Sequence, residues 1–421
     1  MGPLHEDVLA WIDGHAEDLA VLFRRLVATP SVVGAEGDCQ RLVAEMLAPV
    51  CDRLDVWEPD RTWLEAHPAY FQRGVEFRGR PNVVGVVHGR GGGRSLIVNA
   101  HVDVVDPGPA EAWPHGPWSG AVAEGCCYGR GTIDDKAGLA ALIFLARGLR
   151  ALGRPLGGDL ILESVVDEEW GGGGTLATLH RGYRADGAIV FEPTAFEVCP
   201  ASRGGQAFRV TVRGKGAHPV RSYEGVSALE KAVPLLAALK ALEARRQARL
   251  RTPLFAEHPV FAPIVVGTIA ADVLPSKVPE TCRFQGLFGY APEEAYRDAR
   301  KELEETMAAA AAADPWLQAH PPEVEWLGLN KEGAAIPADH ALVRCLGAAF
   351  EAGAGQPAKV AGFPAGCDLP FLVRYAGVPG VVFGPGHPTV AHSSGEHIRV
   401  ADLRTTARVL ALAVLDWCGS R

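Results

Sequence analysis

The chain has 421 residues, of which 48% are hydrophobic and 22% charged, and its formal net charge is −9. This length exceeds the size at which a single hydrophobic core usually keeps growing, so we expect two domains. The acidic balance argues against nucleic acid or an anionic membrane as a partner. No apolar stretch of the sequence is long enough to span a bilayer.

Nine cysteines are scattered along the chain without CxxC spacing. Neither a disulfide framework nor a zinc finger is therefore indicated. The N-terminal segment mixes acidic residues into an amphipathic pattern and lacks a basic stretch before an apolar core, so it does not resemble a signal peptide. We expect a reduced, cytoplasmic setting.

Apolar periodicity in the first half of the chain predicts strands that alternate with helices. The predicted helices are residues 9–27, 37–48, 138–152 and 175–180, and the predicted strands are 82–87, 95–99, 160–166 and 188–191. Because these strands are apolar throughout, both faces of their sheet must be covered. We therefore predict an α/β fold whose mixed, mostly parallel sheet has helices on both faces.

The pattern changes after residue 205. Strands with alternating polarity are predicted at 206–212, 265–269 and 281–290, and helices at 227–248 and 292–312. Pro234 should kink or interrupt the first of these helices. The earlier pattern then returns with helices at 342–352 and 403–417 and a strand at 378–383. We expect a smaller α+β domain, residues 206–319, inserted into a domain made of residues 1–205 and 320–421.

Ionisable residues follow two of the predicted strands directly. His101 and Asp103 come after the strand at 95–99, and Glu192 comes after the strand at 188–191. In open α/β sheets this carboxyl edge is where ligands bind. Asp103 could accept the proton on the second ring nitrogen of His101, although an ordinary surface pair is the more frequent explanation of an isolated His-x-Asp.

Two acidic segments follow the same logic. Asp134 and Asp135 precede a helix, and capping is the alternative for either residue. Two adjacent acids exceed what a cap needs, and Asp134 could bridge two cations. In Asp167-Glu168-Glu169 the alternative is a solvated turn, but one glutamate could coordinate a metal while its neighbour acts as a general base.

Three histidines lie near the C-terminus: His387, His392 and His397. The sequence alone does not choose among them, but His392 has the best surroundings, a turn of small residues that lets the backbone approach a site closely. Carboxylates and imidazoles are costly to bury without a partner. Their repeated placement after apolar strands therefore predicts a site for two metal ions.

Six blocks resemble, in their order, the zinc-dependent peptidase and deacylase family of acetylornithine deacetylase, succinyl-diaminopimelate desuccinylase, aminoacylase and glutamate carboxypeptidase. The resemblance spans nearly the whole chain and implies a zinc-exopeptidase-like fold, with the inserted domain as a lid and dimerisation domain. The blocks are His101-Val-Asp-Val-Val105, Gly129-Arg-Gly-Thr-Ile-Asp-Asp-Lys136, Asp167-Glu-Glu169, Phe191-Glu-Pro-Thr194, Gly214-Lys-Gly-Ala-His218 and Ala391-His-Ser-Ser-Gly-Glu396.

The resemblance implies a cofactor of two Zn²⁺ ions, for which Co²⁺ or Mn²⁺ can substitute. His101 and Glu192 are similar to the ligands of one zinc, and Glu169 and His392 to those of the other. Asp134 is similar to the bridging ligand. The domain of residues 1–205 and 320–421 would then be the catalytic one.

The resemblance also implies roles for three further residues. Glu168 is similar to the general base that acts on a metal-bridging water, and Asp103 to the residue that orients His101. His218 is similar to a residue that crosses a dimer interface and stabilises the oxyanion in the partner's site. A homodimer through residues 206–319 is therefore expected.

The chain departs from the family pattern at groups that normally grip a substrate carboxylate. Gly289 and Pro370 stand where arginines are common, and Asp272 stands where many relatives carry asparagine. Proline at the latter arginine position is similar to some bacterial acetylornithine deacetylases. These departures weaken the usual case for an N-acyl amino acid as substrate.

The expected activity is hydrolysis of an amide bond in an N-acylated amine or amino acid, most like acetylornithine deacetylase. The alternatives are a dipeptidase or carboxypeptidase, and a deacylase or deformylase of an amine without a carboxylate. A metal-binding relative without turnover is the least favoured, because Glu168 and all five expected ligands are present.

Overall fold

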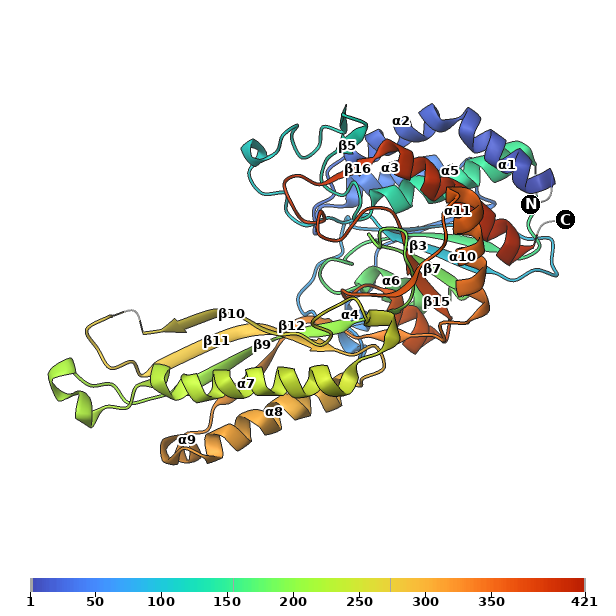
Figure 1. Ribbon diagram of the computed structural model, residues 1–421. Coiled ribbons are helices and arrows are strands. Elements are labelled where there is room, and N and C mark those ends of the chain that lie inside the picture. Colours follow the sequence, from blue (N-terminus) through green and yellow to red (C-terminus); the bar gives the residue numbers. More distant parts are fainter. Residues whose placement is uncertain (1–2, 154, 273, 420–421) are drawn as a thin grey trace. The chain divides into compact units, whose positions relative to one another are not determined.

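The structure is a computed structural model that describes residues 3–153, 155–272 and 274–419 (Figure 1). The chain forms two compact units. The first consists of Met1–Ser202, Ala335–Phe363 and Cys367–Arg421, and the second of Arg203–Ala334 with Pro364–Gly366. Among the described residues, no helix combines the length and apolarity needed to cross a bilayer.

The first unit alternates helices and strands as the apolar pattern predicts. Its helices are α1 (Pro3–Gly14), α2 (Ala16–Val27), α3 (Gly37–Leu47), α4 (Arg61–Ala66), η1 (Ala110–Ala112), α5 (Lys136–Leu152), α6 (Gly173–His180), α10 (Ala341–Ala354), η4 (Phe371–Tyr375) and α11 (Val400–Cys418). Its strands are β1 (Arg53–Trp57), β2 (Asn82–Val87), β3 (Leu96–His101), β4 (Ala121–Ala123), β5 (Cys126–Tyr128), β6 (Leu160–Val165), β7 (Ala188–Phe191), β8 (Val198–Ser202), β13 (Ala334–Ala335), β14 (Val360–Phe363), β15 (Gly380–Phe383) and β16 (His397–Arg399).

The main sheet of the described residues has nine strands in the order β1-β2-β6-β3-β7-β15-β8-β13, with β14 beside β8. Its centre is parallel, because β3 pairs in parallel with β6 and β7, and β7 with β15. The pairs β1–β2, β2–β6 and β8–β15 are antiparallel. The sheet is thus mixed, as expected, and the carboxyl ends of β3, β6 and β7 share one edge.

Helices cover both faces of this sheet. α5 and α11 pack on β3 and against each other, with α1 and α2 in the same layer, whereas α6 packs on β6 with α4 beside it (Figure 1). All residues of β3, β6, β7 and β15 are buried. Strands enclosed on both faces are apolar on both faces, which explains why their sequences run without alternation.

The second unit is a four-stranded antiparallel sheet with two long helices packed on it. Its elements are β9 (Gly204–Arg213), η2 (Pro219–Glu224), α7 (Ala228–Leu250), η3 (Pro253–Phe255), β10 (Ile264–Ala271), β11 (Thr281–Tyr290), α8 (Tyr296–Ala312), α9 (Pro315–Ala319) and β12 (Glu323–Lys331), and the strand order is β10-β11-β9-β12. Alternate residues Phe208 and Val210 of β9 pack with Leu239 of α7 and Leu303 of α8 in one core. One buried and one solvated sheet face explain the alternation in these strands.

The expected boundary between the domains at residues 319 and 320 is wrong. Residues 320–334 belong to the second unit, because β12 pairs with β9 along its length, with Trp326 opposite Phe208. Pro364–Gly366 also joins the second unit, where the Arg203 guanidinium donates to the Pro364 carbonyl. The rest of the first unit therefore consists of Ala335–Phe363 and Cys367–Arg421 instead of residues 320–421.

The expected interruption at Pro234 is absent, because α7 runs through this residue. Pro234 lies on the exposed face of the helix. Because proline has no N–H, the carbonyl one turn earlier lacks its helical hydrogen-bond partner. On this exposed face, water can donate a hydrogen bond to that carbonyl instead.

Candidate metal centre

The register of the parallel strands brings His101 and Glu192 to the same edge. Asn99 of β3 stands opposite Val190 of β7. His101 and Glu192 each lie two residues further along, and both side chains are buried. The same argument applies to β6, where Val165 is opposite His101 and the acidic segment begins two residues later.

Asp134 lies between two histidines, His101 and His392, that are far apart in the sequence. It belongs to the loop that joins β5 to α5. Its Oδ1 is 2.9 Å from Nε2 of His101, and its Oδ2 is 3.2 Å from Nε2 of His392. Each oxygen of one buried carboxylate therefore faces a different imidazole.

Five side chains form two overlapping clusters. The ligand atoms of His101, Asp134 and Glu192 all lie within 4.8 Å of one another, and the same is true of Asp134, Glu169 and His392. Asp134 is common to both clusters. His392 is the most exposed member, with 52% of its side chain accessible, and its Nε2 lies 3.1 Å from Glu169.

Asp103 is arranged differently from the sequence-based expectation. Its backbone carbonyl, 2.9 Å away, is the acceptor for Nδ1 of His101, whereas its carboxylate oxygen is 3.8 Å from that nitrogen. The carboxylate instead accepts the backbone N–H groups of Glu168 and Glu169, at 3.1 and 3.0 Å. Asp103 thus fixes His101 and the glutamate pair at once.

The electrostatics of the clusters favour a shared cation. Burial opposes protonation of His101, but its hydrogen bond to Asp134 and the charges around it raise its pKa well above the usual value. Burial would raise the pKa of Asp134, yet hydrogen bonds from His101 and His392 hold it well below its usual range. Burial, followed by the charges of Glu168 and Asp134, raises the pKa of Glu192 well above normal. A cation would relieve this crowding of carboxylates.

The loop that carries His392 is held by an ion pair that the sequence did not single out. Arg130 donates to Glu396 at 2.6 Å and to the carbonyl of His392 at 3.2 Å, and both charged side chains are buried. Glu396 also accepts the N–H of Ile133 at 3.1 Å. Both charged residues lie inside blocks that carry the family resemblance, and that position was the available signal.

The remaining expected residues are not members of either cluster. His218 is exposed at the start of η2, and its Nδ1 accepts the N–H of Val220 at 3.3 Å. Its expected role across a dimer interface stays a prediction. Asp272 pairs with Lys277 at 3.3 Å and accepts the N–H of Glu280 at 2.7 Å. Pro370 directly precedes η4 in the first unit.

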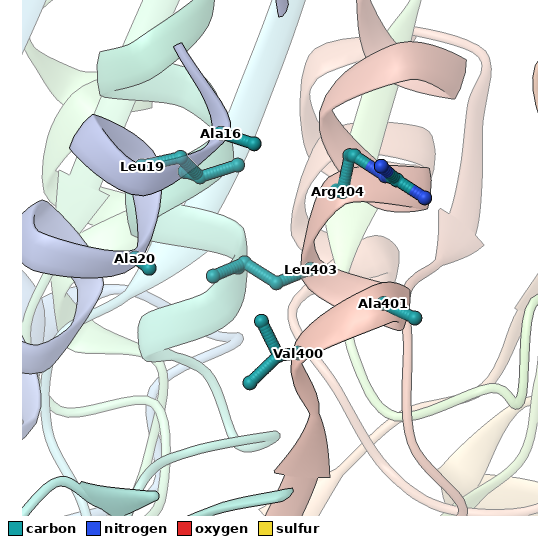
Figure 2. A pocket seen from close by; sticks show the side chains of 7 residues that line it. All are labelled: Ala16, Leu19, Ala20, Val400, Ala401, Leu403 and Arg404. Carbon is teal, nitrogen blue, oxygen red and sulfur yellow. The ribbon is translucent and has the colours of Figure 1, made fainter. Parts of the chain in front are cut away.

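A separate hollow of about 250 Å³ lies between α2 and α11 (Figure 2). Leu19 on one helix faces Val400 and Leu403 on the other, and Arg404 is the only charged residue among the described residues that line the hollow. None of these lining residues is an acid or a histidine, so the hollow is not part of the metal-ligating clusters.

The α/β sheet carries two overlapping clusters of imidazoles and carboxylates at its carboxyl edge, an arrangement typical of metal-dependent hydrolases. The model of Peptidase family M20/M25/M40 matches residues 97–416. The chain belongs to this family, which confirms the resemblance in the sequence.

Curated relatives cover most of the chain. An N-formyl-4-amino-5-aminomethyl-2-methylpyrimidine deformylase from Halalkalibacterium halodurans is 30% identical over 99% of this chain and 98% of its own length. An acetylornithine deacetylase from Myxococcus xanthus is 31% identical over 83% of this chain and 86% of its own length.

Solved structures share the fold. A tripeptidase from Staphylococcus aureus has a TM-score of 0.74 at 19% identity and covers 96% of this chain and 98% of its own. A dinuclear metal-binding peptidase of family M20 from Bacillus subtilis has a TM-score of 0.64 at 15% identity, with 96% and 99% covered. These likenesses confirm the fold class that the sequence predicted.

Proposed function

We propose that the protein hydrolyses the amide bond of an N-acylated amine that lacks a carboxylate, with N-formyl derivatives of aminomethyl heteroaromatic amines as the favoured substrates. The full-length similarity to a deformylase of such an amine is the observation that carries this proposal. The missing arginines suggested a deacylase or deformylase of an amine without a carboxylate. The similarity favours that alternative and makes an acetylornithine deacetylase the weaker candidate.

The surroundings of Gly289 support a substrate without a carboxylate. A Cβ atom at this position would lie 2.6 Å from the ring of Pro263, so the backbone leaves no room for the arginine common in relatives. The neighbouring cation, Arg246, is buried and already bound. It donates to the carbonyl of Gly289 at 2.9 Å and forms ion pairs at 2.6 Å with Glu294 and Glu302. Its charge is therefore neutralised within the second unit.

Deacetylation of acetylornithine is the second candidate, supported by the similarity to the Myxococcus xanthus enzyme. An acidic residue of the second unit, Asp272, could pair with the cationic side chain of such a substrate. Its carboxylate already binds Lys277 and the Glu280 N–H, so it gives this candidate little support. The peptidases with solved structures are too distant in sequence to support a peptidase activity.

We propose that two divalent ions bind where the clusters overlap, and that Zn²⁺ is the favoured metal. His101 and Glu192 would hold one ion, Glu169 and His392 the other, and Asp134 both. Two imidazoles and three carboxylates are a donor set that zinc accepts, and the crowding of buried carboxylates fits this assignment. When bound, the two ions would polarise the acyl carbonyl and make water a stronger nucleophile.

Glu168 is the proposed general base. Its side chain is 7% exposed, and the hydrogen bond from its N–H to Asp103 fixes its backbone. Glu168 would take a proton from the attacking water as the water oxygen bonds to the acyl carbon. It would then give that proton to the amine nitrogen as the C–N bond breaks, which releases the carboxylic acid and the free amine. The proton of the acid passes to the released amine, so the products leave as carboxylate and ammonium.

A homodimer through the second unit belongs to the same proposal. β10 is an edge strand of eight residues without a charged side chain, and Val265 and Ile269 on it are about half exposed. Such an edge is a template for pairing with another chain. His218 would reach the partner's site. With Nδ1 accepting from Val220, its ring proton lies on Nε2, which gives it a donor for an oxyanion.

A cytoplasmic setting is also proposed. All nine cysteines lie within the described residues and are free thiols, as a reducing compartment requires.

The test is a panel of N-formyl and N-acetyl amines, each with and without a carboxylate, assayed for release of primary amine with Zn²⁺, Co²⁺ or Mn²⁺. N-formyl amines without a carboxylate should give the highest kcat/KM. A higher kcat/KM for N-acetylornithine or for a dipeptide would reject the proposed substrate class.

A further inference from the structure

The turn that carries Glu168 and Glu169 begins at Asp167, which occupies an unusual backbone conformation. Asp167 follows β6 with φ of 70°, in the left-handed region that non-glycine residues rarely adopt. Its carbonyl accepts the N–H groups of Gly171 and Gly172, at 2.9 and 2.6 Å. The direction in which the two glutamates leave the strand is therefore set at this residue.

The carboxylate of Asp167 is completely buried and held by groups from a distant segment. Tyr70 donates its hydroxyl to Oδ2 at 3.1 Å, and Arg80 approaches Oδ1 at 3.4 Å. The N–H of Gly173 also donates to Oδ2, at 3.2 Å. Arg80 is anchored in turn by Glu36, with two hydrogen bonds of 2.7 and 2.6 Å. A bidentate pair of this kind fixes the guanidinium in both position and orientation.

The glycine run after the glutamates is explained by the same contacts. A Cβ at Gly171 would lie 3.0 Å from the ring of Tyr70, and one at Gly173 would lie 3.1 Å from that ring and 2.9 Å from the Asp167 carboxylate. The tyrosine ring thus lies directly against the segment that returns from the turn. Two sets of contacts therefore hold this turn. Tyr70 and Arg80 bind the side chain of Asp167. The Asp103 carboxylate accepts the N–H groups of Glu168 and Glu169.

We propose that Tyr70 and Arg80 are positioning residues for the general base, acting through Asp167 on the orientation of Glu168. This inference rests on the proposed role of Glu168. Both positioning residues precede residues 97–416, the part of the chain that the family model matches.

The test uses Tyr70→Phe, which keeps the ring and removes only the hydroxyl. The matched control is Tyr183→Phe, because Tyr183 also donates to an aspartate held by an arginine: its hydroxyl is 3.0 Å from Asp55, which pairs with Arg181 at 2.9 Å. Asp55 lies on the edge strand β1, two places from β6, and belongs to neither cluster. Arg80→Lys serves as a second variant.

We expect Tyr70→Phe and Arg80→Lys to lower kcat by between about 10- and 100-fold, with KM within about twofold of wild type and a shifted acidic limb in the pH profile of kcat. Tyr183→Phe should leave all three unchanged. Hydrogen exchange gives a readout that is independent of activity: amides of residues 167–173 should exchange faster in Tyr70→Phe than in wild type or Tyr183→Phe.

Three results distinguish the outcomes. Unchanged kcat, pH profile and amide exchange in a folded Tyr70→Phe protein would overturn the inference. Equal losses in Tyr70→Phe and Tyr183→Phe would reduce Tyr70 to general stabilisation and would also overturn it. If Glu168→Gln keeps full activity, the proposed base itself is wrong, whatever the exchange data show.

Discussion

Arg130 and Glu396 form a buried ion pair of 2.6 Å that joins the two loops carrying Asp134 and His392. Glu396 accepts the N–H of the residue before Asp134, and Arg130 donates to the carbonyl of His392. The ion pair therefore fixes the position of Asp134, the carboxylate shared by both clusters, relative to His392.

Glu396→Gln should weaken metal binding at the Glu169 and His392 site. The amide keeps the shape of the side chain but leaves the buried Arg130 charge uncompensated, so the His392 loop loses its anchor. We expect the dissociation constant of the weaker ion to rise by about 10- to 100-fold, measured by competition with a chromophoric chelator. Asp402→Asn, which removes the exposed Arg399–Asp402 pair, should not change it. If Glu396→Gln and Asp402→Asn bound the weaker ion with equal affinity, the link between the Arg130–Glu396 pair and the metal site would be refuted.

Glu168→Gln should abolish turnover without removing the metals. The neutral amide cannot accept a proton from water, so we expect kcat to fall by about 10²- to 10⁴-fold. Metal content by elemental analysis should stay at the wild-type value. Glu124→Gln, in the turn between β4 and β5, is a control that should leave kcat unchanged. Substantial turnover in Glu168→Gln would assign the proton transfer elsewhere.

Metal affinity should rise with pH. Hydrogen bonds to Asp134 and Glu169 raise the pKa of His392 to about 10 from 6.5. In protein stripped of metal, the protonated imidazole of His392 therefore contributes to the free energy of folding. This contribution is fully present below pH 6.5 and is lost as the pH rises through about 10. Metal needs the neutral imidazole and must displace that proton.

The affinity should therefore increase with pH, by about tenfold per unit for each proton displaced. Chelator competition at pH values from 6.5 to 9 measures this slope. His392→Ala should bind more weakly and show a smaller slope. An identical slope in His392→Ala would mean that other groups release the protons.

Gly289→Arg should destabilise the protein and should not create activity toward carboxylate-bearing substrates. The new Cβ would meet the ring of Pro263, and overpacking of this kind costs about 1–3 kcal/mol. Urea unfolding measures the loss. Leu287→Arg is the control, since Leu287 is 41% exposed on the same strand, and its free energy of unfolding should stay close to wild type. Efficient hydrolysis of N-acetylornithine by a stable Gly289→Arg protein would contradict the steric argument.

Ile269→Lys should convert the proposed dimer to a monomer. A charge on the uncovered β10 edge opposes pairing with a second copy. Light scattering coupled to size-exclusion chromatography should give the dimer mass for wild type and the 44.6 kDa monomer mass for the variant. Val122→Lys, on an exposed apolar residue of the first unit, should remain dimeric. A monomeric wild type at micromolar concentration would end the dimer proposal.

The parts of the site that follow apolar strands could be predicted from the sequence. A strand buried on both faces has an unbroken apolar run, so its carboxyl end is easy to locate, and the ionisable residue after it is conspicuous. His101 and Glu192 meet because parallel register brings such ends together. The fold class followed from the same runs.

What the sequence could not predict depends on contacts between distant residues. Arg80 and Asp167 are 87 residues apart, and nothing local marks them as partners. The Asp103 carboxylate was expected at the imidazole, but it accepts backbone N–H groups that lie 65 and 66 residues further along the chain. β12 was missed because its membership is decided by pairing with β9, not by its own apolar pattern.

The order of strands in the main sheet has a consequence for biosynthesis. β15 lies between β7 and β8, yet it leaves the ribosome only after the whole of the second unit, Pro364–Gly366 included, has been translated. β7 and β8 are synthesised earlier, but the sheet between them cannot be completed until β15 is available. His392 emerges later still, so a nascent chain exposes only an incomplete chelating set, and full metal loading belongs to the finished polypeptide.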